Sequence, residues 1–207
     1  MKPQVTTDTS FLVLDAMGVI YEVGDDVGEL LVPFIREKNG HCDISAIERL
    51  YDEAILGRLT AKQFWIALGL NPKLEDEYLQ RYRLSTGAIE FLQRASKHFS
   101  SIWCLSNDLS EWSLTLRRRF RLKAYVGGFV VSGDVGCRKP ESRIFQILLG
   151  QVRVQPTQII FVDDKKVNLD TAASLGFDTV LFDPRGAAGP VAHRVARNFG
   201  DLAKLIL

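Results

Sequence analysis

The sequence is poor in cysteine and has no paired metal-binding cysteines. This composition argues against a protein held together by disulfides and against a cysteine-ligated zinc protein. Its 207 residues include only three cysteines, Cys42, Cys104 and Cys137, which are widely spaced and form no Cys-x-x-Cys pair. An odd number of separated cysteines fits free thiols in a reducing compartment better than a disulfide framework or a zinc site. We therefore expect a cytoplasmic protein.

The sequence also lacks an excess of charge and any long apolar run. Lys and Arg number 26 against 25 Asp and Glu, so no overall field would attract a polyanion. The one basic cluster, residues 117–121, lies where a helix is expected to end, and a solvated surface is its simpler interpretation. No segment approaches the ~18–20 apolar residues of a membrane helix, and the first residues lack the apolar region of a signal peptide. We expect neither a nucleic-acid nor a membrane partner.

Short apolar runs alternate with segments of helical periodicity along most of the chain. The expected strands are residues 11–14, 101–105, 128–131, 159–162 and 179–182, and the expected helices are residues 87–99, 111–120, 141–149 and 168–175. This alternation predicts an α/β fold of the Rossmann-like kind, a parallel sheet with helices on both faces.

Residues 22–85 interrupt the alternation because they contain helical signals and no convincing strand. Helical spacing is found at residues 47–56 and 60–68, and Thr60 with Gln63 has the pattern of a capping box. The aromatic side chains of Tyr51, Phe64 and Trp65 are expected to pack in a core rather than to contact a ligand. We predict an α/β core of residues 1–21 and 86–207 and a small α-helical cap of residues 22–85.

Polar residues follow the predicted strands or precede the helices after them. They are Asp15 before a turn at Gly18, then Ser106, Asn107 and Asp108, then Lys139 before Pro140, and finally Asp163 and Asp164. Singly, such residues are typical of turns, helix caps and solvated surface. Open α/β sheets, however, build their sites at the carboxyl ends of their strands. Two adjacent carboxylates there repel each other unless a cation lies between them, and Mg²⁺ takes such oxygen ligands.

In this order the motifs resemble those of the haloacid dehalogenase (HAD) superfamily, hydrolases with an aspartate nucleophile that are mostly phosphatases. Asp15 matches the nucleophile, Ser106 the hydroxyl of the second motif, Lys139 the lysine of the third, and Asp163 and Asp164 the acidic fourth motif. The resemblance covers nearly the whole chain. Residues 132–136, the pair Lys139 and Pro140, Asn168, residues 175–177 and the run 57–65 are similar to the subgroup with a small helical cap after the first strand.

The resemblance implies a Mg²⁺-dependent phosphatase or phosphotransferase that acts on a small phosphorylated metabolite. Asp15 would attack phosphorus and form an aspartyl-phosphate, which divides one difficult displacement into two easier ones. The metal ligands would be Asp15, the backbone carbonyl of Met17, Asp163 and Asp164. Lys139 would hold Asp15 and the phosphoryl oxygens, Ser106 would donate a hydrogen bond to the substrate, and Asn107 would help to bind it. The sequence specifies neither the substrate nor the oligomeric state.

Met17 departs from the family pattern, in which this residue is usually an Asp that serves as general acid and base. A thioether has no transferable proton, and loss of acid–base help typically costs about 10²–10⁴-fold in rate. The backbone carbonyl that would hold the metal is retained. Other side chains that could supply the proton are Asp108, Glu22, Asp25, Asp26 and His41.

Three interpretations of Met17 remain open. The leading one is a phosphatase whose leaving group departs easily or whose proton comes from elsewhere. A second is a different reaction: 2-haloacid dehalogenases also lack the Asp but lack the paired fourth-motif aspartates, and phosphonate-cleaving relatives use a lysine of the cap, where Lys38 and Lys62 lie. The third is a catalytically impaired binding or regulatory protein, which the intact remaining motifs disfavour.

Overall fold

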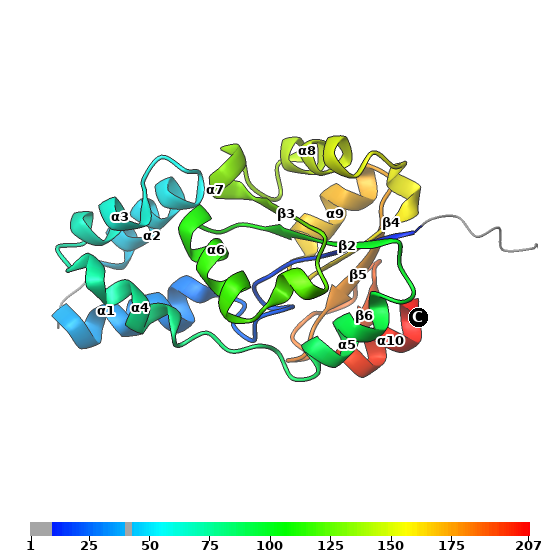
Figure 1. Cartoon of the computed structure of the whole chain (residues 1–207), viewed down its shortest axis with the longest axis horizontal. Helices are drawn as coiled ribbons and strands as arrows, with labels where there is room; N and C mark the ends of the chain where they lie inside the picture. The colour runs from blue at the N-terminus through cyan, green and yellow to red at the C-terminus, as the bar shows by residue number, and fades with distance from the viewer. Residues whose placement is uncertain (1–9, 40–42) are drawn as a thin grey trace, which may run out of the picture.

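A six-stranded parallel sheet forms the centre of the computed structural model, which describes residues 10–39 and 43–207 (Figure 1). The strand order is β3-β2-β1-β4-β5-β6, and all adjacent pairs are parallel. The strands are β1 (Phe11–Leu14), β2 (Ser101–Ser106), β3 (Gly128–Val131), β4 (Ile159–Asp163), β5 (Asp178–Phe182) and β6 (Arg194–Ala196). The predicted α/β fold is confirmed, and β6 is a strand that the sequence pattern did not predict.

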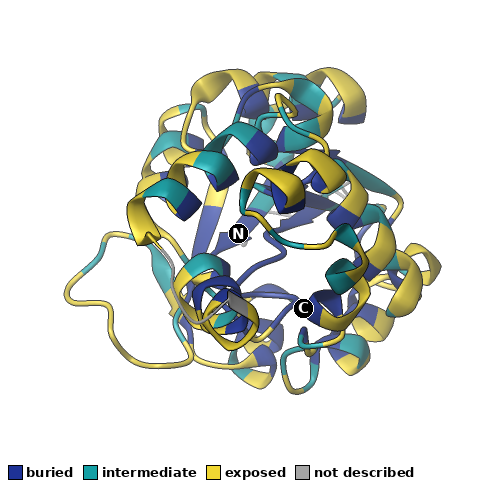
Figure 2. Ribbon diagram, turned by 90° about the vertical axis from the view of Figure 1, so that its left-hand side faces the viewer, coloured by how far each residue is buried: buried dark blue, intermediate teal, exposed yellow. Residues whose placement is uncertain are grey.

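Helices cover both faces of the sheet because successive residues of each strand point to opposite sides. Leu12 and Leu14 of β1 belong to one apolar cluster and Val13 to the other. The first cluster includes α5 (Ala88–Ala95), α6 (Ser110–Arg119) and α10 (Phe199–Ile206), and the second includes α8 (Ser142–Val152) and α9 (Lys166–Ser174). Figure 2 shows the buried strands between helices whose outer faces are exposed. The short helices η3 (Leu122–Ala124), α7 (Ser132–Val135) and η4 (Pro156–Gln158) complete this part of the chain.

Residues 22–85, which we call the cap segment, form a group of helices at one end of the sheet (left in Figure 1). These are η1 (Val27–Leu31), α1 (Val32–Asn39), α2 (Ile44–Ile55), α3 (Ala61–Ala67), η2 (Pro72–Leu74) and α4 (Glu75–Leu79). Two chain crossings join the segment to the sheet, where Glu22 N donates to Arg83 O at 3.0 Å and Ser85 N to Ile20 O at 2.9 Å. The exact domain boundaries stay a prediction.

The capping box of α3 is present as predicted. Gln63 N donates to Thr60 Oγ1 at 3.2 Å, and Thr60 N donates to Gln63 Oε1 at 2.9 Å. Phe64 and Trp65 of this helix are fully buried, and Trp65 packs against Trp112 of α6 with ring centroids 5.8 Å apart. The indole nitrogens of both tryptophans donate to the same oxygen, Glu75 Oε2. The cap segment and the sheet part therefore share one apolar core.

The remaining predictions are met in part. Cys104 and Cys137 are free and buried, whereas Cys42 lies outside the described residues. Within the basic cluster, Arg119 is not merely solvated, because it donates to the carbonyl oxygens of Leu79 and Gln80 at the end of α4. Among the described residues, no helix has the length and the apolar character needed to cross a membrane.

Candidate active site

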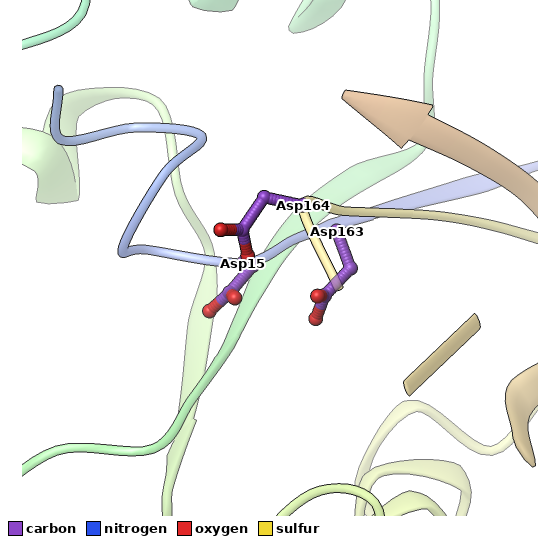
Figure 3. A group of neighbouring side chains, drawn as sticks. All are labelled: Asp15, Asp163 and Asp164. Carbon is purple, nitrogen blue, oxygen red and sulfur yellow. The ribbon is translucent and has the colours of Figure 1, made fainter. Parts of the chain in front are cut away.

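Three carboxylates meet at the carboxyl edge of the sheet (Figure 3). Leu14 pairs with Val162, so Asp15 and Asp163 leave the neighbouring strands β1 and β4 at the same level. Asp15, Asp163 and Asp164 each place one oxygen within 4.8 Å of the others. The parallel register thus assembles, from residues almost 150 positions apart in sequence, a cluster that Coulomb repulsion would oppose in the absence of positive charge.

Lys139 supplies one of the positive charges of the cluster. Its Nζ lies 2.7 Å from Asp15 Oδ1 and 2.7 Å from Asp163 Oδ2, and its side chain is almost entirely buried. Burial alone would lower the pKa of Lys139, but the carboxylates of Asp15 and Asp163 raise it above its usual value. The lysine is therefore charged at neutral pH.

One ammonium does not compensate for three carboxylates. Burial raises the pKa of Asp15 well above its usual value, Asp163 and Asp164 raise it further, and Lys139 only partly opposes them. A carboxylate is a nucleophile only when ionised, so this arrangement works best with a further cation near Asp15.

Asp163 and Asp164 differ in the hydrogen bonds that their carboxylate oxygens accept from the protein. Asp163 accepts hydrogen bonds from Lys139 Nζ, from Lys165 N at 2.8 Å and from Asn168 Nδ2 at 3.0 Å. Asp164 Oδ1, by contrast, is buried and has no hydrogen-bond partner among the described residues. An orphaned carboxylate oxygen beside Asp15 fits a hard divalent cation, and Mg²⁺ prefers a site of one or two carboxylates completed by water and phosphate.

Asn107 holds the backbone of Lys139 rather than leaving its amide free. Asn107 Nδ2 donates to Lys139 O at 2.9 Å, and Lys139 N donates to Asn107 Oδ1 at 2.8 Å. These two bonds tie the end of β2 to the lysine, which precedes Pro140 through a cis peptide bond. The predicted substrate-binding role of Asn107 stays a prediction, since both ends of its amide already have partners.

Ser106 and Asp108, on either side of Asn107, are both buried with unpartnered side-chain oxygens among the described residues. Ser106 does not line the cavity beside Asp15, so its predicted role as a hydrogen-bond donor to the substrate stays a prediction. Asp108 is completely buried and does not line the cavity beside Asp15. Burial raises its pKa well above the usual value, and the nearby Asp26 raises it further.

A cavity of about 250 Å³ opens between the carboxyl edge of the sheet and the cap segment. The sheet part contributes Asp15, Met17, Asn107, Arg138, Lys139, Lys165 and Asn168, and the cap segment contributes Gly24, Asp25, Asp26, Val27, Glu48, Tyr51, Asp52 and Ile55. Met17 is buried and faces this cavity, so an apolar side chain stands close to Asp15.

The candidates for a replacement general acid differ in whether they line this cavity. Asp25 and Asp26 line it, while Asp108 does not, and Glu22 faces a different pocket. His41 lies outside the described residues. Neither Lys38 nor Lys62 lines the cavity, and Lys38 is paired with Glu77 at 2.7 Å.

Several cavity residues were not predicted from the sequence. Glu48, Tyr51, Asp52 and Ile55 of α2 line it together. Their spacing of three and four residues puts them on one helix face, a pattern visible in the sequence but equally typical of a core-facing helix. Asp52 forms an ion pair with Arg138, the residue before Lys139, which links α2 to the lysine segment. Nothing in a single sequence identifies that pairing.

The comparison that decides the family covers most of the chain. Residues 13–176 match the family model described as haloacid dehalogenase-like hydrolase. The chain belongs to the haloacid dehalogenase-like hydrolases. The resemblance inferred from the motifs is confirmed, and with it the assignment to an enzyme family of hydrolase type.

Individual HAD relatives differ in their reactions. The chain is 29% identical over 119 residues to the ribulose-1,5-bisphosphate 5-phosphatase of Halopiger xanaduensis, covering 57% of this chain and 50% of that protein. It is 24% identical to the (S)-2-haloacid dehalogenase 4A of Burkholderia cepacia, over 71% of this chain and 65% of that protein. The chain thus matches about half to two thirds of the length of these curated relatives.

A solved HAD structure extends the likeness to the fold as a whole. A family enzyme of Bacteroides thetaiotaomicron, an aspartate-to-alanine variant in complex with magnesium and inorganic phosphate, superposes with a TM-score of 0.73 at 18% identity. The match covers 89% of this chain and 98% of that one. At this identity the likeness shows the fold alone.

Proposed function

We propose that this HAD protein is a Mg²⁺-dependent phosphatase or phosphotransferase that acts through an aspartyl-phosphate at Asp15. The observation that carries the proposal is the contact of Lys139 with both Asp15 and Asp163, beside the orphaned oxygen of Asp164. A site with three carboxylates around one buried ammonium is suited to a divalent cation and a phosphoryl group. Relatives that are phosphatases support this class of reaction.

Each site residue has a defined task in this proposal. Asp15, the backbone carbonyl of Met17 and Asp164 would hold Mg²⁺, and Asp163 is retained as a predicted ligand although its oxygens already accept from protein donors. When bound, Mg²⁺ supplies neutralising charge to the transferring oxygens. Lys139 orients Asp15 and contacts the phosphoryl group, Ser106 donates to a phosphoryl oxygen, and Asn107 keeps Lys139 in place.

The covalent step uses the carboxylate of Asp15. A bond forms between an Asp15 oxygen and phosphorus while the bond from phosphorus to the leaving oxygen breaks, and the leaving oxygen takes the electron pair. Water, or another acceptor hydroxyl, then attacks the phosphorus and restores the carboxylate. The cavity of about 250 Å³ limits the substrate to a small phosphorylated metabolite.

The direct test is phosphate release from an activated aryl phosphate with Mg²⁺. We expect slow release by the wild-type protein and none by Asp15→Asn, because the amide is not a nucleophile at phosphorus. A stoichiometric, acid-stable phosphoryl adduct should be trapped in the wild type alone. Equal rates for the two proteins across a broad panel of phosphate esters would contradict the proposal.

Met17 and the dehalogenase relative favour a second candidate, displacement of halide from a 2-haloacid by Asp15. Chloride release from 2-chloropropionate in the absence of metal would support it. The phosphonate reaction has less support because neither Lys38 nor Lys62 lines the cavity. A chain without turnover in any of these assays that still binds phosphate with Mg²⁺ would be the impaired binding protein.

A further inference from the structure

We propose that Asp26 of the cap segment is the general acid and base of this site and takes the role that Met17 cannot perform. The inference rests on the proposed function, because it concerns the leaving group of the same phosphoryl transfer. Asp26 is one of five candidates named by the sequence, and the structure separates it by position, burial and hydrogen bonding from Asp108, Glu22 and Asp25, the other candidates among the described residues.

The position of Asp26 fits this role. Asp26 directly precedes η1 and lines the cavity of about 250 Å³ that Asp15, Met17 and Lys139 also line. Asp15 and Lys139 belong to the sheet part, whereas Asp26 belongs to the cap segment. A substrate whose phosphoryl group lies at Asp15 extends its leaving group toward the cap segment, where Asp26 is available.

Hydrogen bonds hold the carboxyl group of Asp26 in one orientation. The residue is 8% exposed, and its Oδ2 accepts hydrogen bonds from the hydroxyl of Tyr51 and, at 3.5 Å, from that of Tyr82. Tyr82 in turn bonds to the hydroxyl of Tyr78 at 3.0 Å. These tyrosines come from α2, α4 and the segment after α4, so packing of the cap segment fixes the group that faces the cavity.

Burial and neighbouring charges have opposing effects on the carboxyl group of Asp26. Burial raises its pKa above the usual value, the hydrogen bond from Tyr51 and the ammonium of Lys165 lower it, and Asp25 raises it. Asp108 is buried as well, and that burial raises the pKa of its own carboxyl group. A carboxyl group with a raised pKa keeps its proton closer to neutral pH, as a general acid requires.

The neighbouring Asp25 is the other candidate general acid beside the same site. Asp25 also lines the cavity, but it is exposed, and its Oδ1 accepts from Gly28 N at 3.0 Å. That bond is a helix-capping contact, which an Asn at this position would retain. Asp25→Asn is therefore a matched control for Asp26→Asn, one residue away in the same cavity.

The proton balance of the proposed step is complete. As the bond from phosphorus to the leaving oxygen breaks, that oxygen takes the proton of the Asp26 carboxyl group and leaves as an alcohol, and Asp26 becomes a carboxylate. In the second step the Asp26 carboxylate accepts a proton from the water that attacks the aspartyl-phosphate. Asp15 leaves as a carboxylate, and both residues return to their starting states.

The decisive experiment measures the first turnover with a series of substituted phenyl phosphates whose leaving phenols differ in pKa. A good leaving group departs as an anion without a proton, whereas a poor one needs the acid. We expect a shallow dependence on phenol pKa for the wild type and Asp25→Asn, and a steep one for Asp26→Asn. The loss should reach about 10²–10⁴-fold with unsubstituted phenyl phosphate and be nearly absent with 2,4-dinitrophenyl phosphate.

The second step gives an independent kinetic signature. With 2,4-dinitrophenyl phosphate, Asp26→Asn should release one equivalent of phenol per Asp15 and then stall as the aspartyl-phosphate, because no base activates water. Equal losses with every leaving group, with no burst, would indicate a merely structural role and overturn the proposal. Absence of a phosphoryl adduct in the wild type would instead reject the proposed function, so the two failures are distinct.

Two further measurements do not depend on turnover alone. In metal-free protein, infrared spectroscopy should show protonated carboxyl absorption, to which Asp108 also contributes, that is weaker in Asp26→Asn and unchanged in Asp25→Asn. Tyr51→Phe removes a donor that stabilises the Asp26 carboxylate, so the alkaline limb of the pH profile for phenyl phosphate should move to higher pH. An unmoved limb, or a band equally strong in Asp26→Asn, would contradict the assignment.

Discussion

Gly18 follows the candidate nucleophile by three residues, and a larger residue at its position would be strained and would press on the side chain of Asp164. Its backbone has φ +72°, a left-handed conformation that glycine adopts without a steric penalty. A Cβ atom built there would lie 2.5 Å from Asp164 Oδ2. The turn after Asp15 and the carboxylate of Asp164 are therefore packed against each other, and the shape of the turn sets where that carboxylate lies.

At the scale of this residue we predict that Gly18→Ala damages the metal site beyond its cost in strain. Gly69 is a matched control because it has the same φ of +72° but nothing within 4 Å of an added Cβ. Both substitutions should lower the free energy of unfolding by about 1–2 kcal/mol, but only Gly18→Ala should weaken Mg²⁺ binding, as followed by calorimetry. Equal Mg²⁺ affinity in the two variants would show that Asp164 is not a ligand.

At the scale of elements, one carboxylate joins three helices. Glu75 at the start of α4 accepts from the indole of Trp65 on α3 at 3.1 Å and from that of Trp112 on α6 at 3.0 Å. Both indole rings are fully buried, so each N–H needs an acceptor inside the protein. The junction of the cap segment with the sheet part thus depends on a polar contact within an aromatic core.

We predict that Glu75→Ala destabilises the protein by about 2–4 kcal/mol, because two buried N–H donors lose their acceptor. Glu75→Gln keeps one carbonyl oxygen and should cost less than half as much. Urea denaturation followed by tryptophan fluorescence measures both. A loss below about 0.5 kcal/mol for Glu75→Ala would mean that water replaces the carboxylate without difficulty.

The sequence predicted the elements with long apolar runs and missed those without them. Strands β1 to β5 were located to within about a residue because each is a buried run. Strand β6 has only three residues and lies at the sheet edge with Val195 partly exposed, so it offers no such run. Helix α10, of eight residues, was not predicted either.

The site also has a part that the sequence could predict and a part that it could not. The cluster of Asp15, Lys139 and the paired aspartates was predictable because each follows a strand or precedes a helix. The surroundings of Asp26 were not, because Tyr51 and Tyr82 reach it only through the packing of helices distant in sequence.

At the scale of the whole molecule, buried carboxyl groups make stability depend on pH. Asp108 is completely buried with no hydrogen-bond partner for either oxygen among the described residues, and burial raises its pKa well above the usual 3.8. The folded protein therefore keeps a proton that the unfolded chain releases above about pH 4. Its contribution to stability falls as pH rises from the unfolded pKa toward the folded pKa.

We predict that Asp108→Asn removes this dependence. The free energy of unfolding of the wild type, measured in urea with EDTA, should fall relative to that of the variant as the pH rises above about 4, by at most about 1.4 kcal/mol per pH unit. Asp76→Asn, at an exposed position, should instead give a constant offset from the wild type. Parallel curves for wild type and Asp108→Asn would show that Asp108 is solvated in the folded protein.

The charge of the cluster around Lys139 also bears on the order in which the metal and the substrate bind. With all groups ionised, the three carboxylates and one ammonium sum to a formal charge of −2. A phosphate monoester near neutral pH brings about −1.5 to −2 more, so the fully ionised, metal-free cluster opposes binding of the phosphoryl group. A divalent cation brings the sum to zero, and we therefore expect compulsory ordered addition, with the metal binding before the phosphate ester.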